Sequence, residues 1–226
     1  MEPSTDVDRA WEAWNRFFHV CDQERFNKLF ARQELFARTR DLPGHIIDCG
    51  VFKGSSTLGW AHLLAAYSPH ALKKVVGFDL FDKKMIDYLP YEKDEVERMM
   101  DRHMDRETDY FAFLNQVIAR KGLAQRCELV KGDICETLPA YLDQHRGMRI
   151  SLLHLDVDIY KPTLAILRSA FDLIVPGGLI VFDEYAYEGF GESDAVDEFL
   201  RERGLRERTR IRLVEHTHTP TAYIQL

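Results

Sequence analysis

Leu155-Asp156-Val157-Asp158 and, later in the chain, Val181-Phe182-Asp183-Glu184-Tyr185 each close an apolar run with a pair of acids. The two runs, residues 150–155 and 179–182, have the length and composition of buried strands. A helical stretch with Pro162 in its first turn joins them, so we expect a βαβ unit whose strands are parallel neighbours. Four carboxylates then project from adjacent strand ends at one rim of a sheet.

These four carboxylates predict a ligand site at that rim. In open α/β sheets, ligands bind at the carboxyl ends of the strands. Massed acids repel one another unless a cation lies among them, and oxygen ligands suit a hard divalent ion such as Mg²⁺, with Mn²⁺ as the alternative. In the other interpretation these acids only cap turns or face solvent. Four acids on two adjacent strand ends are a poor choice for capping alone.

Strand-like and helical segments alternate along most of the chain. We expect strands at residues 45–49, 74–79, 127–131 and 150–156, a fifth after the turn Pro176-Gly177-Gly178, and a hairpin of 211–215 with 222–226. This alternation predicts an α/β fold: a doubly wound, mostly parallel, seven-stranded sheet with a C-terminal antiparallel hairpin.

Two segments lie outside this alternation. Residues 1–44 form an N-terminal helical extension, which either caps the site or forms a homodimer interface. Residues 81–121 form a helical insertion rich in methionine and aromatic residues, which is either a packed helical pair or a lid over the ligands. Because no Gly-, Ser- or Pro-rich linker divides the chain, we expect residues 1–226 to form a single domain.

Composition excludes several classes of partner. The chain has 226 residues, of which 46% are hydrophobic and 30% charged, and its net charge of −7 argues against nucleic acid and anionic membranes. We see neither a secretory segment nor an apolar run of about 18 residues, so a cytoplasmic protein without a membrane partner is expected. The widely spaced Cys21, Cys49, Cys127 and Cys135 are predicted to be free thiols.

The loop after the first strand, Asp48-Cys49-Gly50-Val51-Phe52-Lys53-Gly54-Ser55-Ser56, is a candidate cofactor loop. Glycines let backbone N–H groups approach a ligand, and the N-terminus of the following helix favours an anion. Ser55 or Ser56 is available as its N-cap. The spacing G-x-x-x-G differs from the dinucleotide fingerprint G-x-G-x-x-G, and a plain tight turn is the alternative.

Two further strand ends extend this loop into a longer site. The Asp79 carboxylate can hold both hydroxyls of a ribose, and Asp133-Ile134 can reach the edge of an adenine. An amino-acid tail, a ribose and a base in series fit S-adenosylmethionine better than a dinucleotide. The predicted cofactor contacts are Asp48, Gly50, Val51, Gly54, Ser55, Ser56, Asp79, Asp133, Ile134 and Asp156.

The chain resembles class I S-adenosylmethionine-dependent methyltransferases, and more closely the macrocin O-methyltransferase family of sugar O-methyltransferases. The matching segments are residues 46–56, 75–82, 129–139, 151–163, 176–185 and 191–199, and the resemblance extends from residue 25 to 226. The pair Leu155-Asp156-Val157-Asp158-Ile159-Tyr160 and Phe182-Asp183-Glu184-Tyr185 is its most specific part.

This resemblance implies roles for the acids. Asp156, Asp183 and Glu184 match the positions that hold Mg²⁺, although the family usually has Asp where this chain has Glu184. Asp158 matches the general base. The implied activity is metal-dependent methyl transfer from S-adenosylmethionine to a hydroxyl of a sugar, in a nucleotide-linked deoxysugar or a natural-product glycoside.

Three alternatives remain at this point. The acceptor can be a catechol, a phenol or another small natural product. An NAD(P)-dependent oxidoreductase would use a similar sheet, but the chain lacks G-x-G-x-x-G and a Tyr-x-x-x-Lys pair. A ligand-binding protein without turnover would keep the fold. Near the acids, His154 is expected to be a core histidine, while Tyr160, Lys161 and Tyr185 are candidate substrate contacts.

Overall fold

The structure, a computed structural model, describes residues 5–82, 90–103 and 108–226. Seven strands form one sheet in the order β3-β2-β1-β4-β5-β7-β6. Strands β1 to β5 are parallel, and β7 pairs antiparallel with β5 and β6. This confirms the predicted doubly wound sheet with its closing hairpin. The strands are β1 His45–Cys49, β2 Val75–Asp79, β3 Cys127–Lys131, β4 Ile150–Leu155, β5 Ile174–Phe182, β6 Arg212–Leu213 and β7 Ala222–Gln225.

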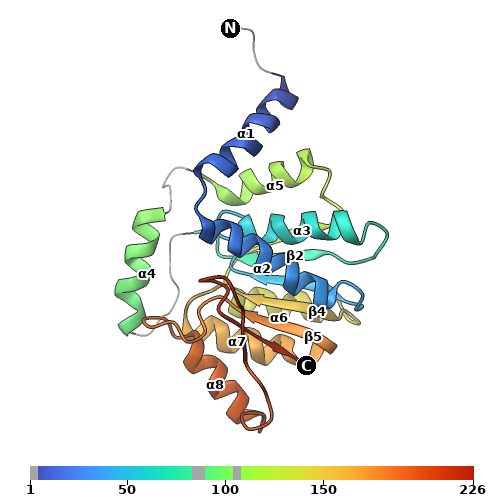
Figure 1. Ribbon diagram of the computed structural model, residues 1–226. Helices are drawn as coiled ribbons and strands as arrows, with labels where there is room; N and C mark the ends of the chain where they lie inside the picture. The colour runs from blue at the N-terminus through green and yellow to red at the C-terminus, as the bar shows by residue number, and fades with distance from the viewer. Residues whose placement is uncertain (1–4, 83–89, 104–107) are drawn as a thin grey trace.

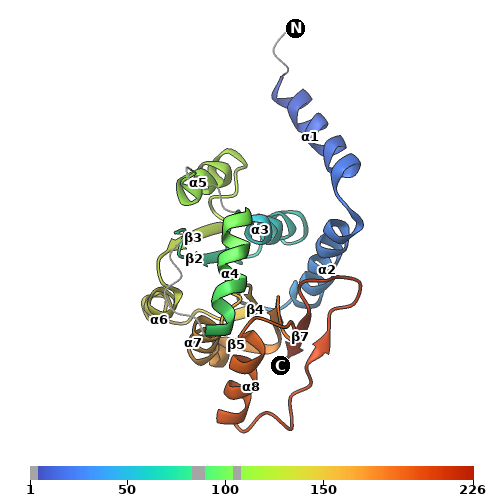
Figure 2. The same cartoon turned by 90° about the vertical axis from the view of Figure 1, so that its left-hand side faces the viewer.

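Helices cover both faces of the sheet (Figures 1 and 2). On one face lie α2 (Gln23–Thr39), α3 (Ser55–Tyr67) and α5 (Tyr110–Arg120). On the other lie α6 (Ile134–Gln144), α7 (Tyr160–Ala170) and α8 (Glu192–Glu202), with the short 3₁₀ helix Phe171–Leu173 after α7. Sequential strands that neighbour each other through helical crossovers produce this two-faced arrangement.

Strand β4 is the centre of the core. All six of its residues are buried, because β1 and β5 flank it and helices cover both faces. Leu153 and Leu155 pack in one cluster and Leu152 in the other, as the alternation of side chains along a strand requires. Each fully buried leucine contributes about 1.5–3 kcal/mol relative to an exposed one.

The register of the three central strands brings the predicted site residues together. Cys49 of β1 lies opposite Leu155 of β4, and Leu155 lies opposite Phe182 of β5. The ladder continues one residue further, since the Asp156 N–H donates to Cys49 O and the Asp183 N–H donates to Leu155 O. Residues that follow these strands therefore line up along a single rim.

Two details differ from the sequence-based expectation. The segment Pro176-Gly177-Gly178, predicted as a turn before the fifth strand, lies inside β5. The pairing of β4 with β5 shifts register between Ile150 and Leu152, and such an irregularity accommodates proline and glycine within a strand. The hairpin strands are also shorter than predicted, and a cis Thr219–Pro220 peptide lies in the turn between them.

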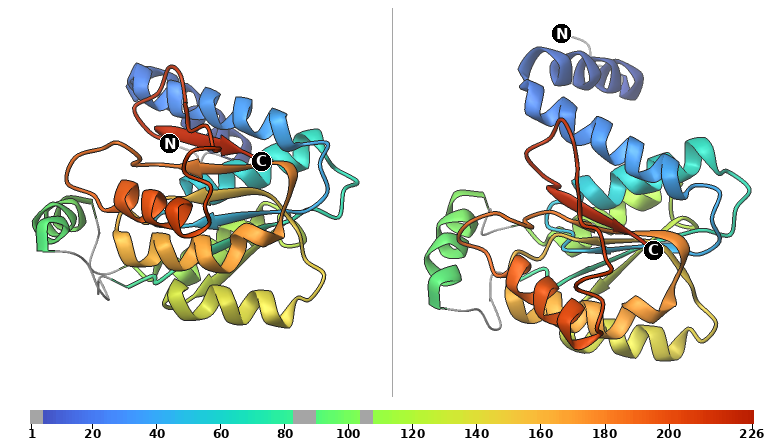
Figure 3. Two further views of the ribbon diagram at one scale, coloured as in Figure 1. Left: turned by 90° about the horizontal axis from the view of Figure 1, so that it is seen from below. Right: turned by 60° about the horizontal axis from the view of Figure 1, so that its bottom comes forward.

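The N-terminal helices behave differently from each other. Helix α1 (Asp6–Val20) has no buried residue and projects from the rest of the molecule (Figure 3). Helix α2 packs on α3 and β5 and buries Leu35 and Phe36. None of the helices in the described ranges is both long and apolar enough to cross a membrane.

The predicted insertion at 81–121 contains α4 (Pro90–His103) and α5. Residues 83–89 and 104–107, with Met85, Tyr88 and Met104, lie outside the described residues. Helix α4 stands beyond the carboxyl ends of the strands (Figure 2), where the candidate lid was expected. All four cysteines are free, as predicted.

Candidate active site

A cleft of about 540 Å³ opens at the carboxyl ends of the parallel strands. The segments that follow β1, β2, β3, β4 and β5 line it, together with Arg25 and Lys28 of α2 and with Thr219 of the turn before β7. Of the predicted site residues it is lined by Gly50, Val51, Ser55, Ser56, Asp79, Asp133, Ile134, Asp156, Asp158, Asp183 and Glu184. Asp48 and Gly54 do not line it.

Asp48 holds the candidate cofactor loop in place from the protein interior. It is fully buried at the end of β1, and its Oδ2 accepts hydrogen bonds from the hydroxyls of Ser56 (2.8 Å) and Thr57. These bonds fasten the first turn of α3 to the strand. The N-cap prediction was wrong: Gly54 occupies the N-cap position at φ 86° and no side chain caps the helix, because Ser56 is engaged with Asp48.

Asp79 closes the second strand and holds two loops at once. Its Oδ2 accepts a hydrogen bond from the Phe52 N–H at 2.7 Å, and its Oδ1 accepts one from the Phe81 N–H at 2.6 Å. Burial raises the pKa of Asp79 despite these bonds. Asp79 thus joins the cofactor loop to the start of the insertion while remaining in the lining of the cleft.

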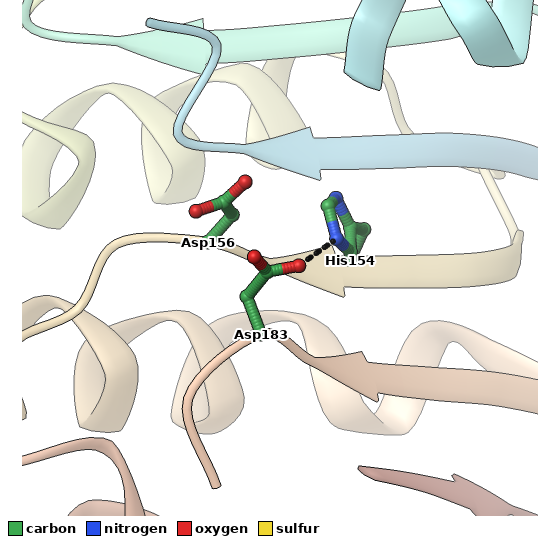
Figure 4. Close-up of side chains that lie close together, drawn as sticks. All are labelled: His154, Asp156 and Asp183. Carbon is green, nitrogen blue, oxygen red and sulfur yellow. Dashed lines mark hydrogen bonds and ion pairs between the residues drawn. The ribbon is translucent and has the colours of Figure 1, made fainter. Parts of the chain in front are cut away.

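The acids after β4 and β5 form two overlapping groups. Ligand atoms of Asp156, Asp158 and Glu184 lie within 4.8 Å of one another, as do those of His154, Asp156 and Asp183. Figure 4 shows Asp156 and Asp183 beyond the tips of neighbouring strands, with their carboxylates close together. The predicted trio of Asp156, Asp183 and Glu184 is therefore split, and Asp156 is the member common to both groups.

Crowding shifts the proton affinities of these acids. Burial and the charge of Asp183 raise the pKa of Asp156 to about 7. Burial and the charge of Asp156 raise the pKa of Asp158 to about 8. Asp158 also has a backbone φ of 63°, a left-handed conformation that is unusual for a residue other than glycine and is found at functional sites.

His154 links this rim to the cofactor loop. Its ring is fully buried, and its Nδ1 lies 2.6 Å from Asp48 Oδ1. Its Nε2 lies 3.2 Å from Asp183 Oδ1, the contact drawn in Figure 4. Burial opposes its charged form, but the hydrogen bonds to Asp183 and Asp48 prevail and raise the pKa of His154 to about 9. The predicted core histidine is confirmed, and it bridges two carboxylates as an imidazolium.

Helix α2 brings cations to the acids, which the sequence interpretation missed. Lys28 Nζ lies 2.8 Å from Asp183 Oδ2, and Arg25 lines the same cleft. Arg32 is only 7% exposed, and its Nε and one Nη have no hydrogen-bond partner in the described part of the chain. The spacing Arg25-x-x-Lys28-x-x-x-Arg32 places all three on one helical face, and this spacing was the signal available in the sequence.

Two further buried acids also escaped notice. Glu92 of α4 is fully buried, and its Oε1 accepts a hydrogen bond from the N–H of Tyr160 at the start of α7. Glu192 of α8 is fully buried, and its Oε1 accepts one from the N–H of Glu184. Isolated glutamates in helical segments carry no sequence signal of such burial.

The candidate substrate contacts separate into two kinds. Lys161 lines the cleft. Tyr160 and Tyr185 direct their hydroxyls to α8, where they donate to Glu198 and Asp197 respectively. The tyrosines therefore brace the loops that carry the acids against α8.

The donor set fits a hard divalent cation. Carboxylate oxygens from Asp156, Asp158 and Glu184 converge, and Glu184 Oε2 is buried without a hydrogen-bond partner in the described structure. A buried carboxylate oxygen without a partner is costly and is stabilised by a bound cation. Burial and the charges of Asp158 and Asp183 raise the pKa of Glu184 well above its usual value, as expected when these acids face one another alone.

A family model described as Macrocin-O-methyltransferase (TylF) matches residues 15–216. Mycinamicin III 3''-O-methyltransferase of Micromonospora griseorubida is 24% identical over 169 residues, 74% of this chain and 64% of that protein. The 8-demethyl-8-(2,3-dimethoxy-alpha-L-rhamnosyl)-tetracenomycin-C 4'-O-methyltransferase of Streptomyces olivaceus is 26% identical over 170 residues, 74% of this chain and 61% of that protein. The chain thus spans less than two thirds of either relative.

The fold has a counterpart among solved structures. The apo structure of CalS11, a TDP-rhamnose 3'-O-methyltransferase in calicheamicin biosynthesis, superposes with a TM-score of 0.70 at 28% identity. The match covers 96% of this chain and 86% of that chain. Since the family model spans the cofactor loop, the acid-bearing strand ends and most of the chain, this protein belongs to the macrocin-O-methyltransferase (TylF) family.

Proposed function

We propose that this protein transfers a methyl group from S-adenosylmethionine to a hydroxyl of a sugar, with the help of a divalent cation, Mg²⁺ in the first place. One observation carries the proposal. The acids Asp156, Asp158 and Glu184 converge in the same cleft that the Gly50 loop and Asp79 line, so a cofactor site and a cation site adjoin.

The cofactor half of the cleft is proposed to use the first three strand ends. Backbone N–H groups of the Gly50–Ser56 loop face the amino-acid tail, Asp79 holds the ribose hydroxyls, and Asp133 with Ile134 contacts the base. S-Adenosylmethionine, when bound, supplies a methyl group on a positively charged sulfur. Asp48 is proposed to act indirectly, because its oxygens are taken by Ser56, Thr57 and His154.

The acid half is proposed to hold the cation and the acceptor. Asp156 and Glu184 hold the cation, with Asp183 as a further ligand. A divalent cation bound there supplies positive charge that makes a nearby hydroxyl more acidic. Asp158 accepts the proton from the acceptor hydroxyl as that oxygen attacks the methyl carbon.

Positioning is a large part of this chemistry. Methyl transfer needs the acceptor oxygen, the methyl carbon and the sulfur in line, and holding them so can supply several kcal/mol of the barrier reduction, ~7–11 kcal/mol at best. Gly50 and Asp156 line the same cleft, which supports placing both proposed ligands in it. Asp48 fastens Ser56 of the loop, and the cleft carboxylates Asp79 and Asp183 accept hydrogen bonds from Phe52 N–H and from Lys28, which favours such pre-alignment.

The acceptor class rests on the named relatives. One relative is named as a 3''-O-methyltransferase of mycinamicin III, and the other as a 4'-O-methyltransferase of a rhamnosyl-tetracenomycin. CalS11 is named for TDP-rhamnose. We therefore propose a sugar hydroxyl, in a nucleotide-linked deoxysugar or a natural-product glycoside.

The test is methyl transfer from isotopically labelled S-adenosylmethionine with Mg²⁺. The acceptor panel holds nucleotide-linked deoxysugars, glycosylated macrolides and, as a contrast, catechols. Label on a sugar hydroxyl that is lost with a chelator is the expected result. If only catechol were labelled, the acceptor would be a catechol and not a sugar. If labelling persisted in the presence of chelator, the reaction would not depend on a metal ion.

A further inference from the structure

The acid cluster, formed by Asp156, Asp158, Asp183 and Glu184, contains an ion pair with a lysine side chain of the protein. Lys28 Nζ lies 2.8 Å from Asp183 Oδ2 and donates to Thr219 Oγ1 at 2.5 Å. Its side chain is 21% exposed, whereas that of Asp183 is 2% exposed. Lys28 therefore enters the cleft from α2 and ends on a carboxylate that follows β5.

Lys28 pairs with the Oδ2 oxygen of Asp183, and both residues line the cleft. The other oxygen, Oδ1, lies 3.2 Å from Nε2 of His154, whose ring is fully buried. Both oxygens of Asp183 are thus engaged, one by a fixed core histidine and one by a flexible lysine.

The cluster as a whole holds more carboxyl groups than cationic side chains. Asp156, Asp158, Asp183 and Glu184 lie together, and the buried Glu192 adds a fifth carboxylate whose Oε2 has no hydrogen-bond partner among the described residues. Lys28 and Arg32 of α2 and the imidazolium of His154 are the cations that act on Asp156. A divalent ion and the Lys28 ammonium would compete for the same carboxylate oxygens. Because the divalent ion carries twice the charge, several carboxylates together attract it more strongly.

We propose that Lys28 is an exchangeable internal counter-ion of the acid cluster, which a divalent cation displaces from Asp183, so that Lys28 sets the affinity of the site for metal. This inference rests on the proposed metal dependence. Without the metal ion, the Lys28 ammonium stabilises the Asp183 carboxylate. When the metal ion binds, the ammonium leaves Asp183 and stays in the cleft beside Thr219. Lys28 thereby couples helix α2 to the state of the metal site.

Titration calorimetry with MnCl₂ tests the exchange, in wild type, Lys28→Met and Arg25→Met. Methionine keeps the aliphatic part of the side chain and removes the charge. Lys28→Met is expected to bind Mn²⁺ roughly tenfold more tightly than wild type, within the usual range of coupling between competing ligands. Arg25 lines the same cleft from the same helix, and within the described residues it makes no ion pair to the acids, so Arg25→Met is expected to change the affinity by less than about threefold.

A second readout follows the ammonium directly. Acetylation of Lys28 by an amine-reactive ester, measured by mass spectrometry in wild-type protein, is expected to speed up several-fold when MnCl₂ is added. Lys73 is the internal control, because its Nζ donates to Thr39 O at 2.7 Å, away from the cleft, and its rate is expected to stay constant. This measurement does not depend on the folding of any variant.

The outcomes separate this inference from the proposed function. Equal Mn²⁺ affinity in wild type and Lys28→Met, or a Lys28 acetylation rate that Mn²⁺ leaves unchanged, would overturn the exchange and leave the metal dependence standing. If Mn²⁺ bound to Lys28→Met but not to wild type, Lys28 would take the place of the metal ion permanently. That result would overturn both the exchange and the metal dependence of the wild-type protein. Absence of binding in every protein would also overturn both.

Discussion

Gly50 and Asp156 approach each other closely through their main chains, and both line the cleft. A β-carbon on Gly50 would lie 1.7 Å from the carbonyl oxygen of Asp156, and Gly50 has a φ of 94°. Both facts require glycine, because a side chain can tolerate neither the backbone contact nor this conformation. The candidate cofactor loop and Asp156, an acid of the proposed cation site, are therefore held against each other by a close backbone contact.

Gly50→Ala is expected to weaken the binding of the cofactor and of the metal ion together. The new methyl group must push the Asp156 backbone away, which displaces the loop and the acid together. Affinity for S-adenosylhomocysteine, measured by calorimetry, should fall by at least roughly tenfold, which corresponds to about 1.4 kcal/mol. The control is Gly59→Ala in α3, where a β-carbon meets nothing within 4 Å and the helix gains up to ~1 kcal/mol. Equal binding by the two variants would contradict the rigid contact.

Asp158→Asn is expected to remove proton transfer and keep cofactor binding. The amide has the size of the carboxyl group but cannot accept the proton of the acceptor hydroxyl. The turnover rate should fall by about 10²–10⁴-fold, as for the loss of a general base. The affinity for S-adenosylhomocysteine should stay within about twofold of wild type, since Asp158 is not a proposed cofactor contact. A rate close to wild type would transfer the role of base to another residue.

Glu184→Gln is expected to weaken metal binding. Glu184 Oε2 is buried with no hydrogen-bond partner in the described ranges, and an amide in its place is a poor ligand for a hard divalent cation. Mn²⁺ affinity should fall by roughly 10–100-fold, whether Glu184 binds directly or orients another ligand. Glu188→Gln removes the same charge from an exposed position of the same loop and should change little. Similar losses in the two variants would indicate a general charge effect.

His154→Leu is expected to destabilise the fold. Leucine leaves Asp48 and Asp183 buried without the imidazolium between them, and a broken buried ion pair costs about 3–5 kcal/mol. Urea unfolding gives the change in free energy. His62→Leu, at an exposed position of α3, should stay within about 0.5 kcal/mol of wild type. A His154→Leu protein as stable as His62→Leu would show that the bridge contributes little.

The sheet and its rim could be predicted because their signals are local. The apolar runs of β4 and β5 end in acids, and the handedness of crossovers makes such strands parallel neighbours. Pairing in register then brings Asp156 and Asp183 to one edge without further information. The family resemblance extended this interpretation to an activity, and the match over residues 15–216 confirms the family.

Contacts between distant elements could not be predicted. Lys28 and Asp183 are separated by 155 residues, and only the packing of α2 on β5 brings them together. The position of Asp48 outside the lining of the cleft could not be predicted for a related reason. A carboxylate at a strand end can face the ligand or the interior, and here the hydroxyls of Ser56 and Thr57 and the ring of His154 hold it inside. The single-domain expectation and the homodimer stay predictions.

The central claim is that a methyl-donor site and a metal site adjoin at the strand ends. Anomalous diffraction at the manganese absorption edge, from crystals grown with S-adenosylhomocysteine and MnCl₂, tests it most directly. The account predicts one manganese peak between the carboxylates of Asp156 and Glu184, with the cofactor product lying along Gly50, Asp79 and Asp133. A manganese peak elsewhere, or none beside a bound cofactor product, would contradict it.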